Sequence, residues 1–277
     1  MDHDPLMTRA RRLWECLAGV PGAFSLSGGP VVVTAPGSAL APPSWVGTVR
    51  LGDTALITAP TDASARAVRR ALDGLPPAAL TDPARIAALL PVAEVLGPAT
   101  LAYPEPGDFR PHPAPDGTVT TLPAGHAELL GLLGAVSESD ADECGLDELT
   151  SPAFVVRDDG GALLAAAGYQ DWPADTAHLC VLTAPRARGR GLARQVASAA
   201  TAHALAAGRL PQWRARPQAS RRVARALGFR ELGRQLSVLL AEAPPAADTG
   251  DGKGRELSAD GSRPFPPAPA SDARRNV

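Results

Sequence analysis

The 277-residue sequence contains few cysteines, few aromatic residues and a single lysine. Its three cysteines, Cys16, Cys144 and Cys180, are odd in number, widely spaced and form no CxxC pair. This pattern argues against a disulfide framework or a structural zinc site and favours a reducing compartment. We therefore expect a cytoplasmic protein that holds no metal.

Long apolar runs are also missing. Glu15 interrupts the first apolar stretch, so no secretory signal is evident. Residues 16–49 carry no charge, but five prolines interrupt them. No continuous apolar run approaches the roughly 20 residues that span a bilayer, so we expect no membrane contact. Hydrophobic residues make up 45% of the chain, which is ample for a packed core.

Acidic residues are absent between Asp175 and Glu231. The same segment contains eleven arginines, at 186, 188, 190, 194, 209, 214, 216, 221, 222, 225 and 230, although the whole chain has a net charge of −2. Such segregation is typical either of a solvated arginine-rich face or of a surface that attracts anions. Only 4% of the residues are aromatic, which leaves few stacking platforms and argues against nucleic-acid binding.

The arginine-rich segment begins with the pattern strand, glycine turn, helix. A short apolar strand ends at Pro185, Gly189 and Gly191 permit a sharp turn, and a helical pattern runs from Leu192 until Gly208 ends it. This turn directs several backbone N–H groups toward one point beside the positive end of a helix. The segment therefore predicts a site for a phosphate or pyrophosphate.

Two common nucleotide motifs do not fit. A Walker A loop needs a lysine after its last glycine, and the only lysine, Lys253, lies far away. A Rossmann turn needs a third small residue where this chain has Arg194. It also needs an acid about 20 residues further on, where this chain has Leu210 to Gln212.

The residues from Arg188 to Ala193 (RGRGLA) resemble motif A of the GCN5-related N-acetyltransferases (GNAT family). Residues 220–229 resemble motif B of that family, which commonly ends in Leu-Gly-Phe, as this segment does. The resemblance covers residues 118–241. It implies an acetyl-CoA-dependent N-acetyltransferase in which an amine attacks the thioester directly.

The resemblance also implies the residues that hold acetyl-CoA. The backbone of Val181, Leu182 and Thr183 would pair with the pantetheine arm. Arg188 and Arg190 would add charge for the pyrophosphate, and Arg221, Arg222 or Arg225 would attract the 3′-phosphate. The backbone N–H groups that would bind the pyrophosphate belong to Gly189, Arg190, Gly191, Leu192, Ala193 and Arg194.

The catalytic residues implied are His178 as a proton relay and Tyr169 or Ser220 as the proton donor to the leaving thiolate. Their structural alternatives are a hydrogen-bonded strand-end histidine, strand packing and a helix cap, respectively. The chain departs from the family pattern at Ala224, where many members have a tyrosine, and at Pro217, where asparagine is usual. These departures favour a second hypothesis, a catalytically inactive CoA-binding protein.

The acceptor is expected to be a small-molecule or peptide amine. Five acids lie where family members often form the acceptor entrance, and they could attract a cationic amine or form a solvated helix face: Glu138, Asp140, Asp142, Glu143 and Glu148. A third hypothesis, nucleic-acid binding by the arginines, is weakened by the composition. No pattern in the sequence indicates an oligomeric state.

The fold class expected is α/β (α+β), with a mixed, mostly antiparallel central sheet flanked by helices. We expect an N-terminal α/β domain over 1–110, a linker over 111–117, the acetyltransferase domain over 118–243 and a disordered tail over 244–277. Residues 56–60 (LITAP) echo residues 181–185 (VLTAP), so the N-terminal domain could be a degenerate copy of the second one.

Hydrophobic periodicity and turn residues predict the individual elements. Helices are expected at 6–17, 62–72 with Asp62 as N-cap, 83–96, 124–136, from 192 to about 207, and over 218–229, and an acidic helix or helical loop is expected at 138–149. Strands are expected at 30–34, 54–58, 100–103, 118–122, 152–157, 162–169, 178–183, 212–216 and 236–240.

Overall fold

The structure, a computed structural model, describes residues 4–25, 29–115 and 117–241. The predicted tail over 244–277 lies outside the described residues. The helices are α1 (Pro5–Ala18), α2 (Asp62–Leu72), α3 (Pro83–Leu89), α4 (Ala127–Leu133), α5 (Glu138–Cys144), α6 (Leu192–Ala206) and α7 (Gln218–Ala226), with short 3₁₀ turns η1 (Ala23–Ser25), η2 (Pro77–Thr81), η3 (Leu146–Glu148) and η4 (Pro185–Ala187). The strands are β1 (Val31–Thr34), β2 (Val46–Leu51), β3 (Thr54–Ala59), β4 (Val92–Tyr103), β5 (Thr120–Leu122), β6 (Ala153–Arg157), β7 (Leu163–Trp172), β8 (Thr176–Thr183), β9 (Leu210–Ala215) and β10 (Arg230–Leu240).

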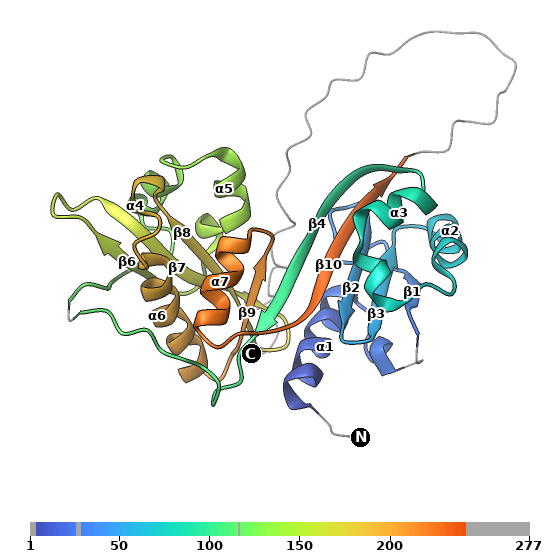
Figure 1. Ribbon diagram of the computed structural model, residues 1–277, viewed down its shortest axis with the longest axis horizontal. Helices are drawn as coiled ribbons and strands as arrows, with labels where there is room; N and C mark the ends of the chain where they lie inside the picture. Colours follow the sequence, from blue (N-terminus) through green and yellow to red (C-terminus); the bar gives the residue numbers. More distant parts are fainter. Residues whose placement is uncertain (1–3, 26–28, 116, 242–277) are drawn as a thin grey trace, which may run out of the picture.

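The described strands form one sheet in the order β1-β3-β2-β10-β4-β9-β8-β7-β6-β5. Neighbouring strands are antiparallel except in the pairs β1–β3 and β8–β9. Helices lie on both faces of the sheet (Figure 1). The predicted fold class, a mixed and mostly antiparallel α/β sheet flanked by helices, is therefore confirmed.

Two long strands join the halves of the sheet (Figure 1). β4 precedes the predicted linker, yet it pairs with β9 of the later segment through Thr100↔Ala215. β10 comes from the end of the described chain, yet it lies between β2 and β4 and pairs with both. Strand pairing thus crosses the predicted boundary in both directions. The division into domains 1–110 and 118–243 stays a prediction.

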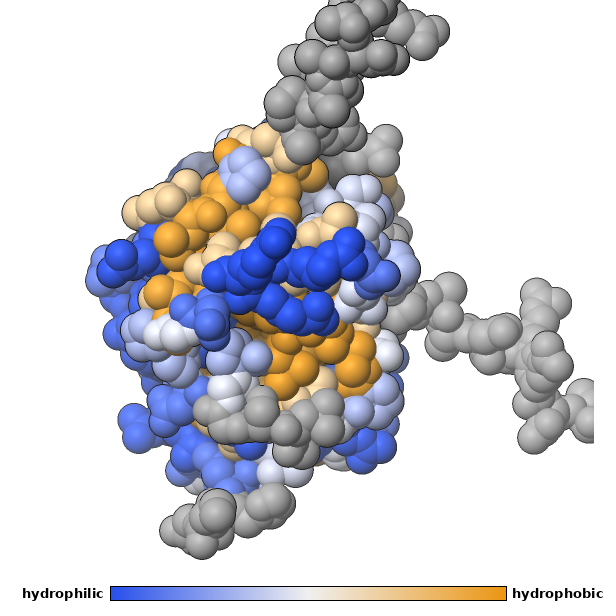
Figure 2. All heavy atoms as spheres, turned by 90° about the vertical axis from the view of Figure 1, so that its right-hand side faces the viewer, coloured by the Kyte–Doolittle hydropathy of each residue, from blue (hydrophilic) through white to orange (hydrophobic). Residues whose placement is uncertain are grey.

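The core follows the alternation of side chains along the strands. In the N-terminal half, Leu56 of β3 packs toward α1, while its neighbour Ile57 packs toward α2 and α3. The indole N–H of Trp14 donates to the hydroxyl of Tyr103 (2.8 Å), which ties α1 to β4. Figure 2 views the end of the molecule that α2 covers, where a hydrophilic band crosses between hydrophobic areas.

Three local predictions need correction. The predicted helix 83–96 ends at Leu89, because Leu90 is extended before Pro91 and the chain enters β4 at Val92. Strand β2 was not predicted; it begins inside the uncharged segment 16–49 and continues through Arg50 to Leu51. The N-cap of α2 is Thr61 rather than Asp62, and it forms a capping box with Ser64.

The similar sequences 56–60 and 181–185 lie at the ends of strands that are connected differently to the rest of the sheet. The parallel partner of β8 is β9, which follows it through α6, whereas the parallel partner of β3 is β1, which precedes it. The turn after β3 is closed by the Thr61 cap and has no glycine pair. The two segments share a strand followed by a helix, but not the turn between them or the pairing of the strand. The duplication stays a prediction.

The glycine of Leu227-Gly228-Phe229 has a steric role. Its φ is +89°, and a Cβ there would lie 2.0 Å from the carbonyl oxygen of Asp108. The carbonyl of Leu227 in turn accepts from the N–H of Arg110 (3.0 Å). The end of motif B therefore packs backbone to backbone against the connection between β4 and β5, which only glycine permits.

Candidate active site

The site lies where two parallel strands separate. β8 and β9 pair only from Thr176↔Leu210 to His178↔Gln212, although both strands continue beyond this point. Residues 179–183 of β8 pair with β7 on one side, while their other edge pairs with no described strand. A cavity of about 650 Å³ is lined by residues of both strands and of α5, α6 and α7. The open edge therefore offers backbone donors and acceptors to a ligand.

The glycine turn closes one end of this cavity. Gly189 (φ +78°) and Gly191 (φ +80°) are left-handed, and Gly191 is the N-cap of α6. Within the described residues, no hydrogen bond takes up the backbone N–H groups of 189–193. The N–H of Arg194 differs from the prediction, because it already donates to the carbonyl of Gly191 (3.0 Å). We call residues 189–193 the cradle, and free N–H groups at a helix start favour an anion.

Most of the predicted donor-site residues line the cavity. They are Val181, Leu182, Thr183, Arg188, Gly189, Gly191, Leu192, Ala193 and Arg194, together with the predicted catalytic residues His178 and Ser220. Arg190 is exposed and is not among the lining residues, so only its backbone belongs to the cradle. Tyr169 is not among them either.

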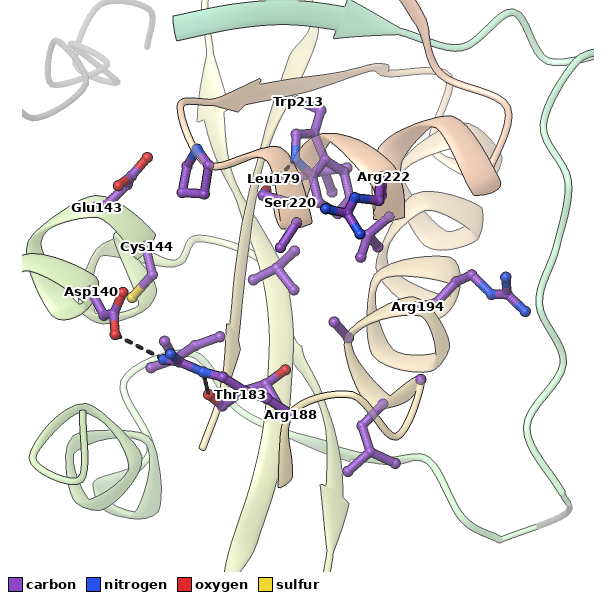
Figure 3. A pocket seen from close by; sticks show the side chains of 18 of the residues that line it. Asp140, Glu143, Cys144, Leu179, Thr183, Arg188, Arg194, Trp213, Ser220 and Arg222 are labelled. Atoms are coloured by element: carbon purple, nitrogen blue, oxygen red, sulfur yellow. Dashed lines mark hydrogen bonds and ion pairs between the residues drawn. The ribbon is translucent and has the colours of Figure 1, made fainter. Parts of the chain in front are cut away.

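The predicted phosphate-binding arginines differ in their surroundings (Figure 3). Arg188 donates to Asp140 (2.8 Å) and to the carbonyl of Thr183 (3.4 Å), and its guanidinium lowers the pKa of the Asp140 carboxyl. The side chain of Arg194 points away from the cavity and donates to His112 (3.0 Å). Arg222 lines the cavity and forms no ion pair with a described residue.

Most of the arginine-rich segment is neutralised in space. Within residues 4–25, 29–115 and 117–241, seven of its eleven arginines pair with acids, most of them from other segments: Arg186 with Asp158, Arg188 with Asp140, Arg209 with Asp171, Arg216 with Glu143, Arg221 and Arg225 with Glu231, and Arg230 with Asp4. Much of the positive charge that is grouped along the chain is therefore balanced by these ion pairs in the fold.

The structure corrects the assignment of Tyr169 as a proton donor. Its ring points toward α6, where its hydroxyl lies 3.0 Å from Nδ1 of His203. Its neighbour Gln170 points to the opposite face, where it donates to Glu148 (2.7 Å). Because alternate residues of a strand face opposite sides, Tyr169 packs under α6 and cannot reach the cavity.

His178 lies at the last pair before the strands separate and is 8% exposed. Its Nδ1–H donates to the side-chain oxygen of Gln212, and its ring stacks on Trp172 with 4.1 Å between centroids. Burial, and next the charge of Arg214, lower the pKa of His178 to about 3. The imidazole is neutral at physiological pH, so the predicted proton relay would have to use a weakly basic Nε2.

This low pKa predicts a pH dependence of stability. Below pH 6.5 the unfolded chain takes up a proton at His178 that the folded chain does not, so the free energy of unfolding falls as the pH drops. Between pH 7 and pH 5 the loss should be about 2 kcal/mol. Urea denaturation at both values should show it, and His178→Gln should remove most of the difference. The same change at His126, whose ring is 37% exposed, should not.

Two further polar side chains belong to the cavity wall. The indole N–H of Trp213 donates to the hydroxyl oxygen of Ser220 (3.0 Å), which leaves the hydroxyl proton of Ser220 available to a ligand. The thiol of Cys144 also lines the cavity, but burial raises its pKa to about 11, so it stays protonated and is no nucleophile. Trp213 and Cys144 were not predicted as site residues.

Fold and site together define an α/β protein with an anion cradle at a helix start beside an open strand edge. Residues 165–234, which include both features, match the family model described as GNAT acetyltransferase. The family resemblance predicted from motifs A and B is thereby confirmed for this segment. No curated protein matches the sequence.

Several solved structures are similar to this chain. A GNAT-family protein from Novosphingobium aromaticivorans is 24% identical over 53% of this chain and 65% of its own (TM-score 0.43). A GCN5-related N-acetyltransferase from Kribbella flavida is 21% identical over 56% and 62% (TM-score 0.43). yncA from Salmonella typhimurium, solved with acetyl-CoA, is 18% identical over 48% and 98% (TM-score 0.32). The first two matches span less than two thirds of those proteins.

None of the described helices is long and apolar enough to cross a membrane. The described histidines, cysteines and acids form no cluster of three that could hold a metal ion.

Proposed function

We propose that the protein is an acetyl-CoA-dependent N-acetyltransferase. The observation that carries the proposal is that the open edge of β8 and the cradle line the same cavity. The cradle would bind the pyrophosphate of acetyl-CoA, and residues 179–183 would pair with the pantetheine arm. Because the cradle follows Thr183, the arm would run back along β8 and bring the acetyl group toward His178. The donor is a substrate, and no metal is required.

The reaction would proceed by direct attack of a neutral amine on the thioester carbonyl carbon. A C–N bond forms, the C–S bond breaks, the amine loses one proton and the departing thiolate takes one up, giving an N-acetyl amine and CoA. An N–H group of the open β8 edge could stabilise the developing oxyanion. Ser220 is the proton donor that the geometry favours, because Trp213 already occupies its oxygen as an acceptor.

A binding and turnover experiment tests the proposal. Acetyl-CoA and CoA should bind at micromolar concentration by calorimetry, and a thiol-release assay over a panel of amines should detect amine-dependent formation of CoA. If neither nucleotide binds at that concentration, the proposal is wrong.

Arg222 is the expected partner of the 3′-phosphate. It lines the cavity without an ion pair to a described residue, whereas Arg225 pairs with Glu231 (3.1 Å) and is not among the lining residues. Arg222→Ala should weaken the binding of CoA about tenfold, the value of one charge-assisted contact. It should leave the binding of 3′-dephospho-CoA unchanged. Arg225→Ala is the control and should change neither affinity by more than about twofold. Equal losses for both nucleotides would refute the assignment.

The second candidate is an inactive CoA-binding protein. It is favoured by Ala224, which is buried in α7 and offers no hydroxyl, and by the low pKa of His178. Calorimetry and thiol release separate the two candidates, because an inactive protein would bind acetyl-CoA without releasing thiol beyond the rate of spontaneous hydrolysis.

Nucleic-acid binding remains a weaker third candidate. Ion pairs with described acids neutralise at least seven of the eleven arginines, and few aromatic rings are available. We further propose a cytoplasmic location, on the basis of the cysteine pattern.

A further inference from the structure

A second, smaller cavity adjoins the first. Its volume is about 140 Å³, and its wall is formed mainly by α5, η3, β7 and β8. Glu143, His178 and Arg214 line both cavities, so the two meet near the last pair of β8 with β9, His178↔Gln212. If the proposed function is correct, this is the point to which the pantetheine arm would bring the acetyl group.

The wall of the second cavity is strongly acidic. Four carboxylates line it, Asp142, Glu143, Asp147 and Glu148, against the one guanidinium of Arg214. Glu143 is paired with Arg216 (3.1 Å), and the partner of Glu148 among the described residues is the neutral amide of Gln170 (2.7 Å). Asp142 and Asp147 form no ion pair or side-chain hydrogen bond with the described residues. Among the described residues, three of the four carboxylates therefore form no ion pair.

A separate observation also indicates a ligand at this junction. His178 is more than nine-tenths buried, lines both cavities, and uses only Nδ1 in its contact with Gln212. Within the described part of the chain, no hydrogen bond occupies its Nε2. Nε2 is not fully enclosed by protein atoms, so it is open to a molecule or water in the cavities. Nε2 of His178 is therefore an acceptor for the N–H of an incoming amine.

The acidic wall restricts the amine that can react. An acceptor with a single amine would be held there as an ammonium ion, because nearby carboxylates favour the charged form, and an ammonium ion cannot attack a thioester. An acceptor with a second cationic group avoids this conflict. The carboxylates can hold the distant ammonium while the other nitrogen becomes neutral beside His178.

We infer that the second cavity is the acceptor site and that it takes small diamines or polyamines rather than monoamines or amino acids. The inference rests on the proposed function. A carboxylate on the acceptor would face three unpaired acids and be repelled, whereas a second ammonium group would be attracted.

Three acceptors that share one carbon chain length test the inference. They are 1,4-diaminobutane, butylamine and 4-aminobutanoate, whose far ends are cationic, neutral and anionic. With acetyl-CoA saturating, kcat/KM should fall about tenfold at each step in that order. Added salt should reduce the advantage of the diamine. An equal rate for the three, or a faster rate for butylamine or 4-aminobutanoate, would overturn the inference.

Variants test whether the preference for the diamine depends on the carboxylates of the second cavity. Asp142→Asn combined with Asp147→Asn should raise KM for 1,4-diaminobutane about tenfold, leave KM for butylamine within about twofold, and leave acetyl-CoA affinity unchanged. Glu138→Gln removes an acid of the same helix α5 that lines neither cavity, and it should change none of these values. A diamine preference that survives the double change would overturn the assignment of the cavity.

Direct binding separates this inference from the proposed function. If acetyl-CoA binds and any amine releases thiol, but without a diamine preference, only the acceptor assignment fails. If acetyl-CoA does not bind, the proposed function fails. In that case calorimetry of the three acceptors with the free protein still decides, because tighter binding of 1,4-diaminobutane supports the cavity assignment and equal or absent binding contradicts it.

Discussion

Gly191→Val should weaken the binding of acetyl-CoA by roughly 100-fold. Gly191 has φ +80° at the N-cap of α6, a conformation that costs an L-residue about 1–2 kcal/mol. A Cβ there would meet no protein atom within 4 Å, so the added side chain would occupy the space in front of the cradle. Losing one or two charge-assisted hydrogen bonds to the pyrophosphate, at about 1.5–3 kcal/mol each, gives the expected loss. Calorimetry measures it.

Gly208 supplies a matched control for this change. It follows the other end of α6, has φ +72°, and also has no atom within 4 Å of a built Cβ. It is not among the residues that line the cavity. Gly208→Val should therefore lower thermal stability about as much as Gly191→Val while leaving acetyl-CoA affinity within about twofold. If both variants lose binding equally, backbone strain in α6 explains the effect and the cradle does not.

Gly233→Ala should lower the free energy of unfolding by about 3 kcal/mol or more, the upper range for overpacking. Gly233 lies in β10 opposite Leu51 of β2 and Leu101 of β4, beside a register shift. A Cβ there would lie 1.8 Å from the carbonyl oxygen of Arg50. Backbone on both sides leaves no room to relax, so the strand that joins the two halves of the sheet must shift. Thermal unfolding should show a decrease of about 6–12 °C.

The helix glycine Gly131 is the control for Gly233. It lies inside α4, and a Cβ there would meet nothing within 4 Å. Gly131→Ala should stabilise the protein slightly, by about 0.5–1 kcal/mol, because alanine loses less backbone entropy in a helix. A Gly233→Ala variant as stable as Gly131→Ala would contradict the insertion of β10 between β2 and β4.

Features that depend on neighbouring residues were predictable from the sequence. The strand, turn and helix from His178 to Ala206 follow from an apolar run, a proline stop and two glycines, and Gly208 ends the helix as expected. The turn between β6 and β7, where Asp158 accepts from the N–H of Ala162, and the start of α1 are equally local. Each of these patterns is settled within a few residues by backbone sterics and capping, so tertiary contacts need not be known.

Features that depend on distant pairing were not predictable. β10, from the end of the described chain, pairs with β2 and β4, and β4 pairs with β9. Nothing in the residues of β4 or β10 specifies these neighbours. β7 is buried on both faces from Leu163 to Gln170, so its hydrophobic pattern could not show that Tyr169 faces α6. A strand that is buried on both sides loses the alternation that identifies its faces.

The ion-pair partners of the arginines could not be predicted from the sequence either. The arginine segment lacks acids along the chain, yet partners such as Asp140 and Glu231 reach it in the fold. Sequence spacing placed Arg188 and Arg222 at the right cavity, but it could not show that, of these two, Arg188 pairs with Asp140 while Arg222 has no ion pair with a described residue. The low pKa of His178 likewise follows from burial against Trp172 and Arg214, which approach it only in the folded protein.

A crystal structure of the protein with bound CoA tests the donor site most directly. The pyrophosphate should lie within hydrogen-bonding distance of the backbone N–H groups of 189–193, and the pantetheine arm should pair with residues 179–183 along the open edge of β8. CoA bound elsewhere, or a pyrophosphate held by side chains away from the start of α6, would contradict the assignment.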